Sequence, residues 1–364
     1  MKRLMLAILP LTVFASIAWA GETHIPAGPV SGEWTEKDSP YVIDGDIVVP
    51  DGQTLTIGQK VTIQFAGHYK LTVNGTLKAM AEHKRKFGFK FGKANDITIH
   101  FTTDLNTNPA GWGGIRFVNA SKNCKLQNCA IENGKATGEG ADGMGGAVYC
   151  ENSSPHIENC SIEKNSATGS GGAIAVVNGS LALANCSVEG NTAGESGGAI
   201  SSTNSSLALA NCSFEKNSVG KLGGGIYVSG GMLSLANASL EKNTGATRGG
   251  GIYADGSTLT VANLSIEANS NGGVALLNGC KADVANCSIE KNQGVDHGGG
   301  IFCSGSTLQL SNASVSGNTS GGIFCADKSA VSLSNCSVEG NHGGGALEHD
   351  DNSTVSKSNT SVED

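Results

Sequence analysis

Residues 197–217 of the chain read GGAISSTNSSLALANCSFEKN, and close copies of this stretch recur along the sequence. Two phrases carry the recurrence: a glycine pair followed by Ala or Gly and then Ile or Val, and a phrase of the form N-C-S-V-E-x-N. The first Asn of the second phrase stands at positions 128, 159, 185, 211, 237, 263, 286, 312, 335 and 359, in steps of 23 to 31 residues. Such a period is typical of a solenoid, in which each repeat forms one coil and stacks on the next.

The spacing inside each repeat predicts the kind of solenoid. Large residues alternate with small or polar ones in Leu207-Ala208-Leu209-Ala210 and in Ile226-Tyr227-Val228, which is the pattern of a strand with one buried face. Each repeat holds three such runs, separated by Gly, Asn and Ser turn signals, and the longer L-x-x-L-x-L pattern of leucine-rich repeats is missing. The fold predicted is all-β: a right-handed parallel β-helix with three sheets and coils of 23–26 residues.

Composition agrees with this prediction and excludes other classes. Glycine accounts for 53 of 364 residues and charged residues for only 15%, which argues against a helical bundle. A hydrophobic share of 38% argues against disorder, since enough apolar surface is present to form a core. The net charge of −8 lacks the basic excess that nucleic-acid binding requires, so nucleic acid is not an expected partner.

The first residues indicate export. Lys2 and Arg3 precede an apolar run that reaches Trp19, and Ala18-Trp19-Ala20 supplies the small-x-small pattern of a cleavage site. We therefore expect residues 1–20 to be a signal peptide and the protein to reach the cell surface or outer membrane, the periplasm or the medium. No later stretch is long and apolar enough to cross a bilayer as a helix.

Three further segments are predicted after the signal peptide. Residues 21–40 are expected to be an N-terminal linker, and residues 41–110 to form irregular capping coils, because they alternate strongly but lack the glycine pair. The cluster Phe87, Phe89 and Phe91 is expected to help close the hydrophobic end, since a solenoid needs a cap. Residues 111–364 are expected to form the regular repeats.

The repeats resemble a known family. The pairing of G-G-A-I with a F-x-x-N phrase, literal at Phe214-Glu215-Lys216-Asn217, resembles the passenger repeats of the polymorphic outer membrane proteins. The stretch from Gly111 to Phe117 is similar to the lead-in coils of exported bacterial right-handed β-helix proteins of the pectin-lyase-like superfold. The resemblance implies the same fold, whereas it says much less about chemistry, because one fold hosts many functions.

The second Asn of each phrase is predicted to form a structural ladder. In a stacked solenoid this Asn falls on its counterpart in the next coil, and stacked amides hydrogen-bond along the column while satisfying turn backbone groups. The predicted ladder consists of Asn165, Asn191, Asn217, Asn243, Asn269, Asn292, Asn318 and Asn341.

The eleven cysteines follow the same register. Six stand directly after the first Asn of the phrase, where Ala238, Leu264 and Ala313 replace cysteine in other repeats, so we expect compact inward hydrophobes. Disulfides between stacked neighbours such as Cys186 and Cys212 stay open as an alternative. No C-x-x-C or His-rich spacing suggests a metal site, and no cofactor is expected.

Two surface columns are the remaining candidates. The Glu of the phrase recurs in almost every repeat, and we expect a solvated face partly neutralised by Lys164, Lys216, Lys242 and Lys291, with a Ca²⁺-bridged strip as the alternative. Aromatic residues follow the inward Ile or Val in several repeats and are expected to face outward on one sheet. This column either stacks across coils or forms a platform for a sugar or protein partner; it consists of Tyr149, Tyr227, Tyr253, Phe302 and Phe324.

No converging catalytic set is visible in the sequence. Arg116 and Arg248 are expected on widely separated coils, and Asp296-His297-Gly298 is only a fragment of the pattern in polygalacturonase-like hydrolases. The leading hypothesis is a non-catalytic exported cell-envelope or surface protein that presents a repetitive surface for adhesion or structural interaction. The alternative is a carbohydrate-binding or carbohydrate-active β-helix. The expected partners are a glycan or a surface protein, with weak end-to-end self-association through the edge strands near Asp364.

Overall fold

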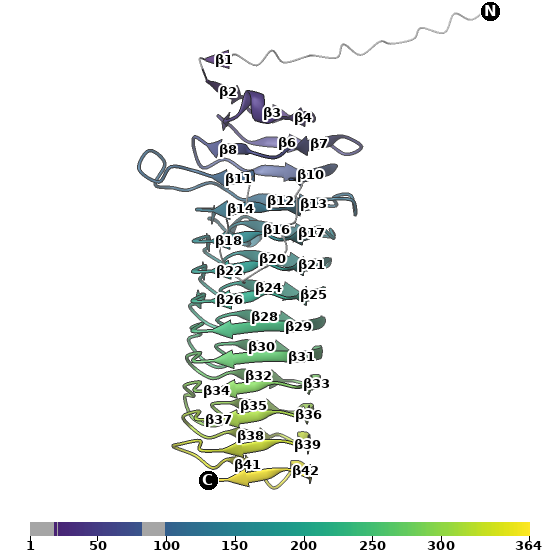
Figure 1. Cartoon of the computed structure of the whole chain (residues 1–364), viewed down its shortest axis with the longest axis vertical. Coiled ribbons are helices and arrows are strands. Elements are labelled where there is room, and N and C mark those ends of the chain that lie inside the picture. Colours follow the sequence, from purple (N-terminus) through teal and green to yellow (C-terminus); the bar gives the residue numbers. More distant parts are fainter. Residues whose placement is uncertain (1–17, 20, 82–98) are drawn as a thin grey trace, which may run out of the picture.

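The computed structural model of the chain describes residues 18–19, 21–81 and 99–364, and it is a single solenoid of stacked coils (Figure 1). Each coil contributes one strand to a long sheet I and two strands to a second long sheet II, and successive coils pair in parallel and in register. The predicted parallel β-helix is thus confirmed. The predicted signal peptide, apart from Ala18 and Trp19, and the Phe87 cluster lie outside the described residues.

Sheet I has 13 strands and contains the run that follows each glycine pair. Its strands are, in order, β3 (Gly28–Pro29), β6 (Ile47–Val49), β9 (Leu71–Val73), β12 (Ile115–Val118), β16 (Val148–Glu151), β20 (Ile174–Val177), β24 (Ile200–Thr203), β28 (Ile226–Ser229), β30 (Ile252–Asp255), β32 (Val274–Leu277), β35 (Ile301–Ser304), β38 (Ile323–Ala326) and β41 (Leu347–His349).

Sheet II has 26 strands, because each coil enters it with two legs that meet at the bend of the N-C-S phrase. The first leg comprises β4 (Gly32–Trp34), β7 (Thr54–Ile57), β10 (Thr76–Met80), β13 (Lys125–Gln127), β17 (His156–Glu158), β21 (Ser180–Ala184), β25 (Ser206–Ala210), β29 (Met232–Glu241), β31 (Thr258–Glu267), β33 (Lys281–Ala285), β36 (Thr307–Ser311), β39 (Ala330–Ser334) and β42 (Thr354–Ser358). Strands β29 and β31 run through the bend and supply both legs.

The second leg adds the strands around the Ser-Val-Glu run. They are β2 (Glu22–Ile25), β5 (Tyr41–Ile43), β8 (Val61–Phe65), β11 (Ile99–Thr102), β14 (Cys129–Glu132), β18 (Ser161–Glu163), β22 (Ser187–Glu189), β26 (Ser213–Glu215), β34 (Ser288–Glu290), β37 (Ser314–Ser316), β40 (Ser337–Glu339) and β43 (Ser361–Glu363), with β1 (Ala18–Trp19) antiparallel to β2. A small third sheet holds β15 (Lys135–Ala136), β19 (Ser166–Ala167), β23 (Thr192–Ala193) and β27 (Ser218–Val219). Two short 3₁₀ turns, η1 (Glu36–Asp38) and η2 (Gly140–Gly143), interrupt the strands.

Residues 21–40 differ from the expected linker. They form strands β2, β3 and β4, which pair in parallel with β5, β6 and β7 of the next coil. Trp34 is buried and stacks on Tyr41, with ring centroids 4.6 Å apart. The segment is therefore a coil of the solenoid; its short strands and mixed polarity do not show the alternation that marks later coils.

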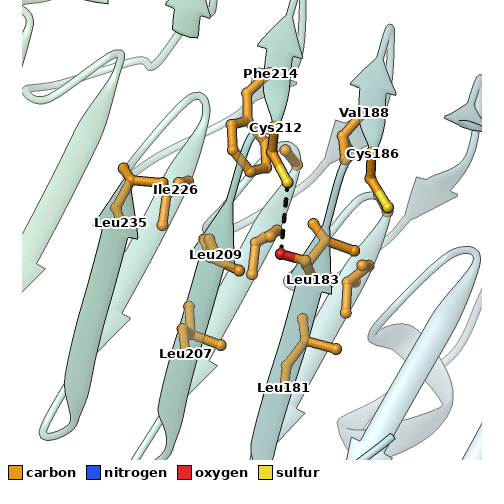
Figure 2. Close-up of a cluster of buried hydrophobic side chains, with 14 of the residues drawn as sticks. Leu181, Leu183, Cys186, Val188, Leu207, Leu209, Cys212, Phe214, Ile226 and Leu235 are labelled. Carbon is orange, nitrogen blue, oxygen red and sulfur yellow. Dashed lines mark hydrogen bonds between the residues drawn. The ribbon is translucent and has the colours of Figure 1, made fainter. Parts of the chain in front are cut away.

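The core consists of inward columns that stack one residue per coil. Leu181, Leu207 and Leu233 share one position, and Val188 pairs with Phe214 in the second leg. These side chains are almost completely buried, and Figure 2 shows how the columns from sheets I and II fill the same interior. Because each coil buries its apolar residues mainly against its neighbours, stability comes from repeated local stacking.

Candidate functional site

The aromatic column on the outward side of sheet I is interrupted. Tyr227 stacks on Tyr253 with ring centroids 5.6 Å apart, and Phe302 stacks on Phe324 at 5.7 Å. Ala275 stands between these two pairs in the register. Ala175 and Ser201 likewise separate Tyr149 from Tyr227. The register therefore creates two stacked pairs and one isolated ring.

Of the two alternatives for this column, stacking across coils is seen in two pairs, and the rings are only partly accessible as a platform. Tyr149 is 3% exposed and Tyr253 is 9% exposed, while Tyr227, Phe302 and Phe324 are half-buried. The cause is the loop before each glycine pair, which folds back over the strand; a Cβ on Gly249 would lie 3.1 Å from the Cβ of Ala275. Whether the rings take part in binding stays a prediction, but any ligand must also contact the covering loops.

The covering loops differ in length from coil to coil. Ile252 stands nine positions after Asn243, and Ile301 stands nine positions after Asn292. In the coil between these two, Val274 stands only five positions after Asn269. The two long loops therefore face each other across a short turn, and residues from coils that are not adjacent come within reach.

Arg248 crosses this short turn. Its Nη2 lies 3.2 Å from Oδ2 of Asp296, and its Nη1 donates to the backbone carbonyl of His297 at 3.3 Å. The guanidinium carbon also lies 3.9 Å from the ring centroid of Phe302, a cation–π contact. The interaction joins loops 48 residues apart in sequence.

His297 repeats this arrangement two coils further on. Arg248 stands directly before glycines 249–251, and His297 stands directly before glycines 298–300. The imidazole stacks on Phe324 with a centroid distance of 4.6 Å, and its Nδ1 lies 3.5 Å from Oε2 of Glu348. Glu348 is held in turn by the backbone N–H of Gly345, which donates to its Oε1 at 2.6 Å. We call Arg248, Asp296, His297 and Glu348, with Phe302 and Phe324, the loop cluster.

The loop cluster is a surface feature with little enclosed space. A shallow depression that encloses almost no volume lies beside it, lined by Arg248, Val295, His297 and Phe302 among others. Pockets that enclose small molecules usually measure about 300–1,000 Å³, so this depression does not enclose a ligand. The side chain of His297 is 52% exposed and that of Asp296 is 65% exposed. The cluster is suited to contact the edge of a larger partner.

The sequence pattern singles out every member of the loop cluster except Glu348, but it does not indicate that they lie close together. The sequence places Arg248 on a coil distant from other polar groups, and Asp296-His297 matches only a fragment of a known motif. The signal was present in the repeat steps, which fall from 26 to 23 residues between Asn263 and Asn286 and again between Asn312 and Asn335. A shortened step removes part of the loop and lets its neighbours meet.

A second arginine anchors the other end of the aromatic column. Arg116 is 5% exposed; its Nη1 donates to the Met144 carbonyl at 2.5 Å and its Nη2 to the Ala141 carbonyl. Its guanidinium carbon lies 4.6 Å from the ring centroid of Tyr149. Burial lowers the pKa of Arg116 and raises the pKa of Tyr149 to about 12. Because these groups are enclosed, they hold η2 against sheet I and leave no site there for a ligand.

The predicted Asn ladder lies inside the solenoid. All eight side chains are 0–4% exposed, and in the first seven the Nδ2 donates to Oδ1 of the next Asn at 2.9–3.0 Å. The same Oδ1 accepts the backbone N–H of the preceding Asn, for example from Asn191 to Asn217 at 3.0 Å. A second Nδ2 proton donates to a carbonyl of the preceding coil, as from Asn217 to Val188 at 2.9 Å. The hydrogen-bonding groups of these amides are therefore paired within the ladder and with backbone groups.

A family model for the right-handed β-helix region matches residues 81–244 and 198–362. The chain belongs to this family. Solved β-helix structures that resemble it include the periplasmic alginate epimerase AlgG, with 13% identity over 93% of this chain and 84% of that chain and a TM-score of 0.45. Another is the A-module of the mannuronan C-5 epimerase AlgE6 of Azotobacter vinelandii, with 15% identity over 94% and 91% of the two chains and a TM-score of 0.34. No curated protein matches the chain. We draw nothing about function from likenesses of this extent.

The cysteines of this β-helix are buried. All eleven are free thiols in the structure, including the stacked run Cys129, Cys160, Cys186 and Cys212. Sulfur atoms contact backbone carbonyls, as from Cys212 to Leu183 at 3.6 Å (Figure 2). Burial raises the pKa of the Cys325 thiol to about 12, which disfavours the reactive thiolate. The thiols therefore pack as compact hydrophobes.

The Glu column of the β-helix lies on the surface of the second leg. Lys216 contacts Glu189 at 3.0 Å and Glu215 at 2.8 Å, and Lys291 contacts Glu267 at 2.7 Å. Lys242 pairs with Glu241. The expected neutralisation is confirmed for these three lysines, although such exposed pairs stabilise a fold by at most about 1 kcal/mol. Among the described residues, no three His, Cys, Asp or Glu side chains are grouped closely enough to hold a metal ion.

In the parts of the β-helix that the structure describes, no helix has the length and apolar character needed to cross a membrane.

Proposed function

We propose that this protein is an exported, non-catalytic β-helix that binds an uncharged polysaccharide through the loop cluster. The observation that carries the proposal is the convergence of Arg248, Asp296, His297 and Glu348 over Phe302 and Phe324. Flat rings beside a few fixed hydrogen-bonding groups are a common composition of small-molecule and sugar-binding surfaces. Asp296 and Glu348 accept hydrogen bonds from hydroxyls, and Arg248 donates to them.

The charge of the cluster favours an uncharged ligand. With histidine counted as neutral, one arginine faces two carboxylates, so the four polar side chains carry one net negative charge. The whole chain also carries a net charge of −8. Like charges repel an anionic polymer and slow its approach, whereas a neutral one meets no such barrier. We therefore expect pectate and alginate to bind less well than neutral glycans.

The openness of the cluster favours binding without catalysis. Catalytic sites exclude water so that electrostatic interactions become strong at the reacting atoms. Here the ion pairs are solvent-exposed and the adjacent depression encloses almost no volume. Both features suit recognition of a polymer lying along the surface and do not suit enclosure of a reacting sugar.

We also propose that the protein is located at the cell surface. It rests on the basic, apolar and small-residue segments of residues 1–20 and on the resemblance of the repeats to outer-membrane passenger domains. We expect protease added to intact cells to degrade the protein. Full protection until the outer membrane is broken would instead show a periplasmic protein.

Binding to a panel of polysaccharides tests the function. The panel contains galactomannan and hydroxyethyl cellulose as neutral polymers, with pectate and alginate as anionic ones, and affinity electrophoresis measures the dissociation constants. We expect the double variant Arg248→Ala with His297→Ala to bind the preferred neutral glycan at least tenfold more weakly. Lys221→Ala is the matched control, because Lys221 lies in the equivalent loop two residues before a glycine pair and pairs with Glu195 outside the cluster.

Three outcomes would contradict the proposal. Unchanged affinity in the double variant would remove the loop cluster as the binding site. Tighter binding of alginate or pectate than of any neutral glycan would overturn the charge argument. Release of reducing ends or unsaturated products above the blank, from any polymer in the panel, would show an enzyme.

A further inference from the structure

The outward side of the first leg of sheet II is a face that carries almost no charge. Eight coils contribute to it, from β21 to β42, and their strands pair in parallel and in register. Its outward positions hold Ala, Ser and Thr with one Gln and one Met, and the charged exceptions are Lys281 and Asp283 on β33. The second leg carries a Glu in almost every one of these coils, so the lack of charge belongs to this face alone. We call the surface between Ser180 and Ser358 the first-leg face.

The composition of the first-leg face differs from that of a sheet that faces only water. A solvated surface typically carries about 25–35% charged residues. Alanine is depleted on strands because its side chain offers little to pack, yet it fills the same outward position in five successive coils: Ala184, Ala210, Ala236, Ala262 and Ala285. Met232, near the middle of the face, is 59% exposed. Small side chains let a second sheet approach to the usual packing distance of about 10 Å, so the composition favours an interface between two sheets.

The first-leg face is large enough for a dimer. A five-residue strand is about 17 Å long and eight coils at the strand spacing extend about 38 Å, so one copy would bury about 650 Å². Two copies together would bury about 1,300 Å², which lies within the range of about 1,200–2,000 Å² for specific protein interfaces.

Lys281 and Asp283 determine how two such faces fit together. Both are exposed, and they lie two positions apart on the same side of β33, about 7 Å along the strand. A two-fold axis parallel to the solenoid axis and midway between them places Lys281 of each copy opposite Asp283 of the other. A two-fold axis along β33 would instead place Lys281 opposite Lys281, and like charges in contact are unfavourable. Charge complementarity therefore favours two solenoids side by side, with their coils in the same order.

The same arrangement also matches side-chain sizes. It brings the first residue of each five-residue run opposite the third residue of the same run in the second copy. Met232 then lies opposite Ser234, and Gln309 lies opposite Thr307. A large side chain thus meets a smaller one, as close packing between sheets requires.

We propose that the first-leg face is the interface of a homodimer, in which two copies lie side by side and Lys281 of each pairs with Asp283 of the other. The strands of the two copies run antiparallel across this interface. The inference does not rest on the proposed function, because the loop cluster lies on the outward side of sheet I. It also differs from end-to-end association, which would use unpaired edge strands and leave this face exposed.

Charge reversal tests this arrangement, with sedimentation velocity of the purified protein at a series of concentrations as the measurement. We expect the wild type to form dimers as its concentration rises. Lys281→Asp or Asp283→Lys alone should raise the dimer dissociation constant at least about tenfold, because like charges then meet. The double variant Lys281→Asp with Asp283→Lys restores opposite charges and should dimerise within about threefold of the wild type. Lys122→Asp is the matched control, because it makes the same change of charge at an exposed turn residue outside the face.

Thermal unfolding confirms that each variant is folded, and the remaining outcomes are decisive. A wild type that stays monomeric at every concentration would overturn the inference. Single reversals that dimerise like the wild type, or a folded double variant as weak as the single ones, would overturn the pairing of Lys281 with Asp283. An equal loss in Lys122→Asp would assign the effect to net charge, against the inference. The loop-cluster variant Arg248→Ala with His297→Ala is expected to dimerise normally, so failure of the proposed function and failure of this inference are seen separately.

Discussion

Replacing Gly250 by Ala is expected to destabilise the protein by at least about 3 kcal/mol, one of the largest effects of a single methyl group in this fold. A Cβ at this position would lie 1.9 Å from the backbone oxygen of Ser270 and 2.9 Å from its carbonyl carbon. Both atoms belong to the next coil, whose backbone is held in register by the pairing of β30 with β32. The backbone of either coil can shift only if that strand pairing breaks.

The third position of the glycine phrase provides the control for this prediction. Gly251 and its counterpart Gly225 occupy the third position of the phrase, where Ala173 and Ala199 stand in earlier coils. Those alanines show that the stack accepts a methyl group there. A Cβ on Gly225 would lie 2.6 Å from the backbone oxygen of Gly251, a much less severe approach than the 1.9 Å at Gly250. Gly225→Ala is therefore expected to cost less than half as much free energy of unfolding as Gly250→Ala, which urea denaturation followed by circular dichroism will measure. Similar losses in Gly250→Ala and Gly225→Ala would show that the close approach of coils is not the cause.

The second large effect is expected for Asn217→Asp, in the middle of the buried ladder. Asn217 is fully buried; its Nδ2 donates to Asn243 Oδ1 at 3.0 Å and to the Val188 carbonyl at 2.9 Å. An ionised carboxylate donates to neither, so two acceptors would face it without a proton in a dry interior. Leaving buried polar groups unpaired costs about 1–3 kcal/mol each, and more for a charged group, so we expect a loss above about 3 kcal/mol at pH 7.

Asn263→Asp is the matched control, at the exposed first Asn of the repeat phrase. Asn263 donates to Asn237 at 2.9 Å, but it is exposed and water solvates a carboxylate there. We expect a loss of about 1 kcal/mol or less. Because protonation restores one donor, the gap between the two variants should narrow as the pH falls toward 4, where carboxyl groups begin to be protonated. Equal free energies of unfolding for Asn217→Asp and Asn263→Asp at pH 7 would show that burial of the ladder amides does not determine the cost.

Several features were readable from single residues and their spacing. Alternation in Leu207-Ala208-Leu209-Ala210 predicted which side chains face the core, because a strand directs successive residues to opposite sides whatever its neighbours are. Replacement of cysteine by Ala238 or Leu264 predicted an apolar site, and the thiols are buried. Stacking of Tyr227 on Tyr253 followed from register, since equal steps bring equal positions together.

Other features depended on segments without such a pattern. Residues 21–40 form a coil because β2, β3 and β4 find partners in the next coil, and their own sequence has too little alternation to show it. Tyr149 is buried because Arg116 and the η2 turn lie over it. The burial of an outward residue depends on the path of a loop, and loop paths are set by contacts elsewhere in the stack.

The sequence by itself determined the repeat, the parallel β-helix, the inward columns and the position of the Asn ladder, because each follows from one period applied to identical coils. Only the tertiary structure decided that Arg248 meets Asp296 and that His297 meets Glu348. These pairs depend on the length of the turn that lies between two long loops, at Asn269 to Val274 in the first case. Coils that are not adjacent make contact because the coil between them has a short turn. The residues that form the contact therefore carry no pattern that predicts it.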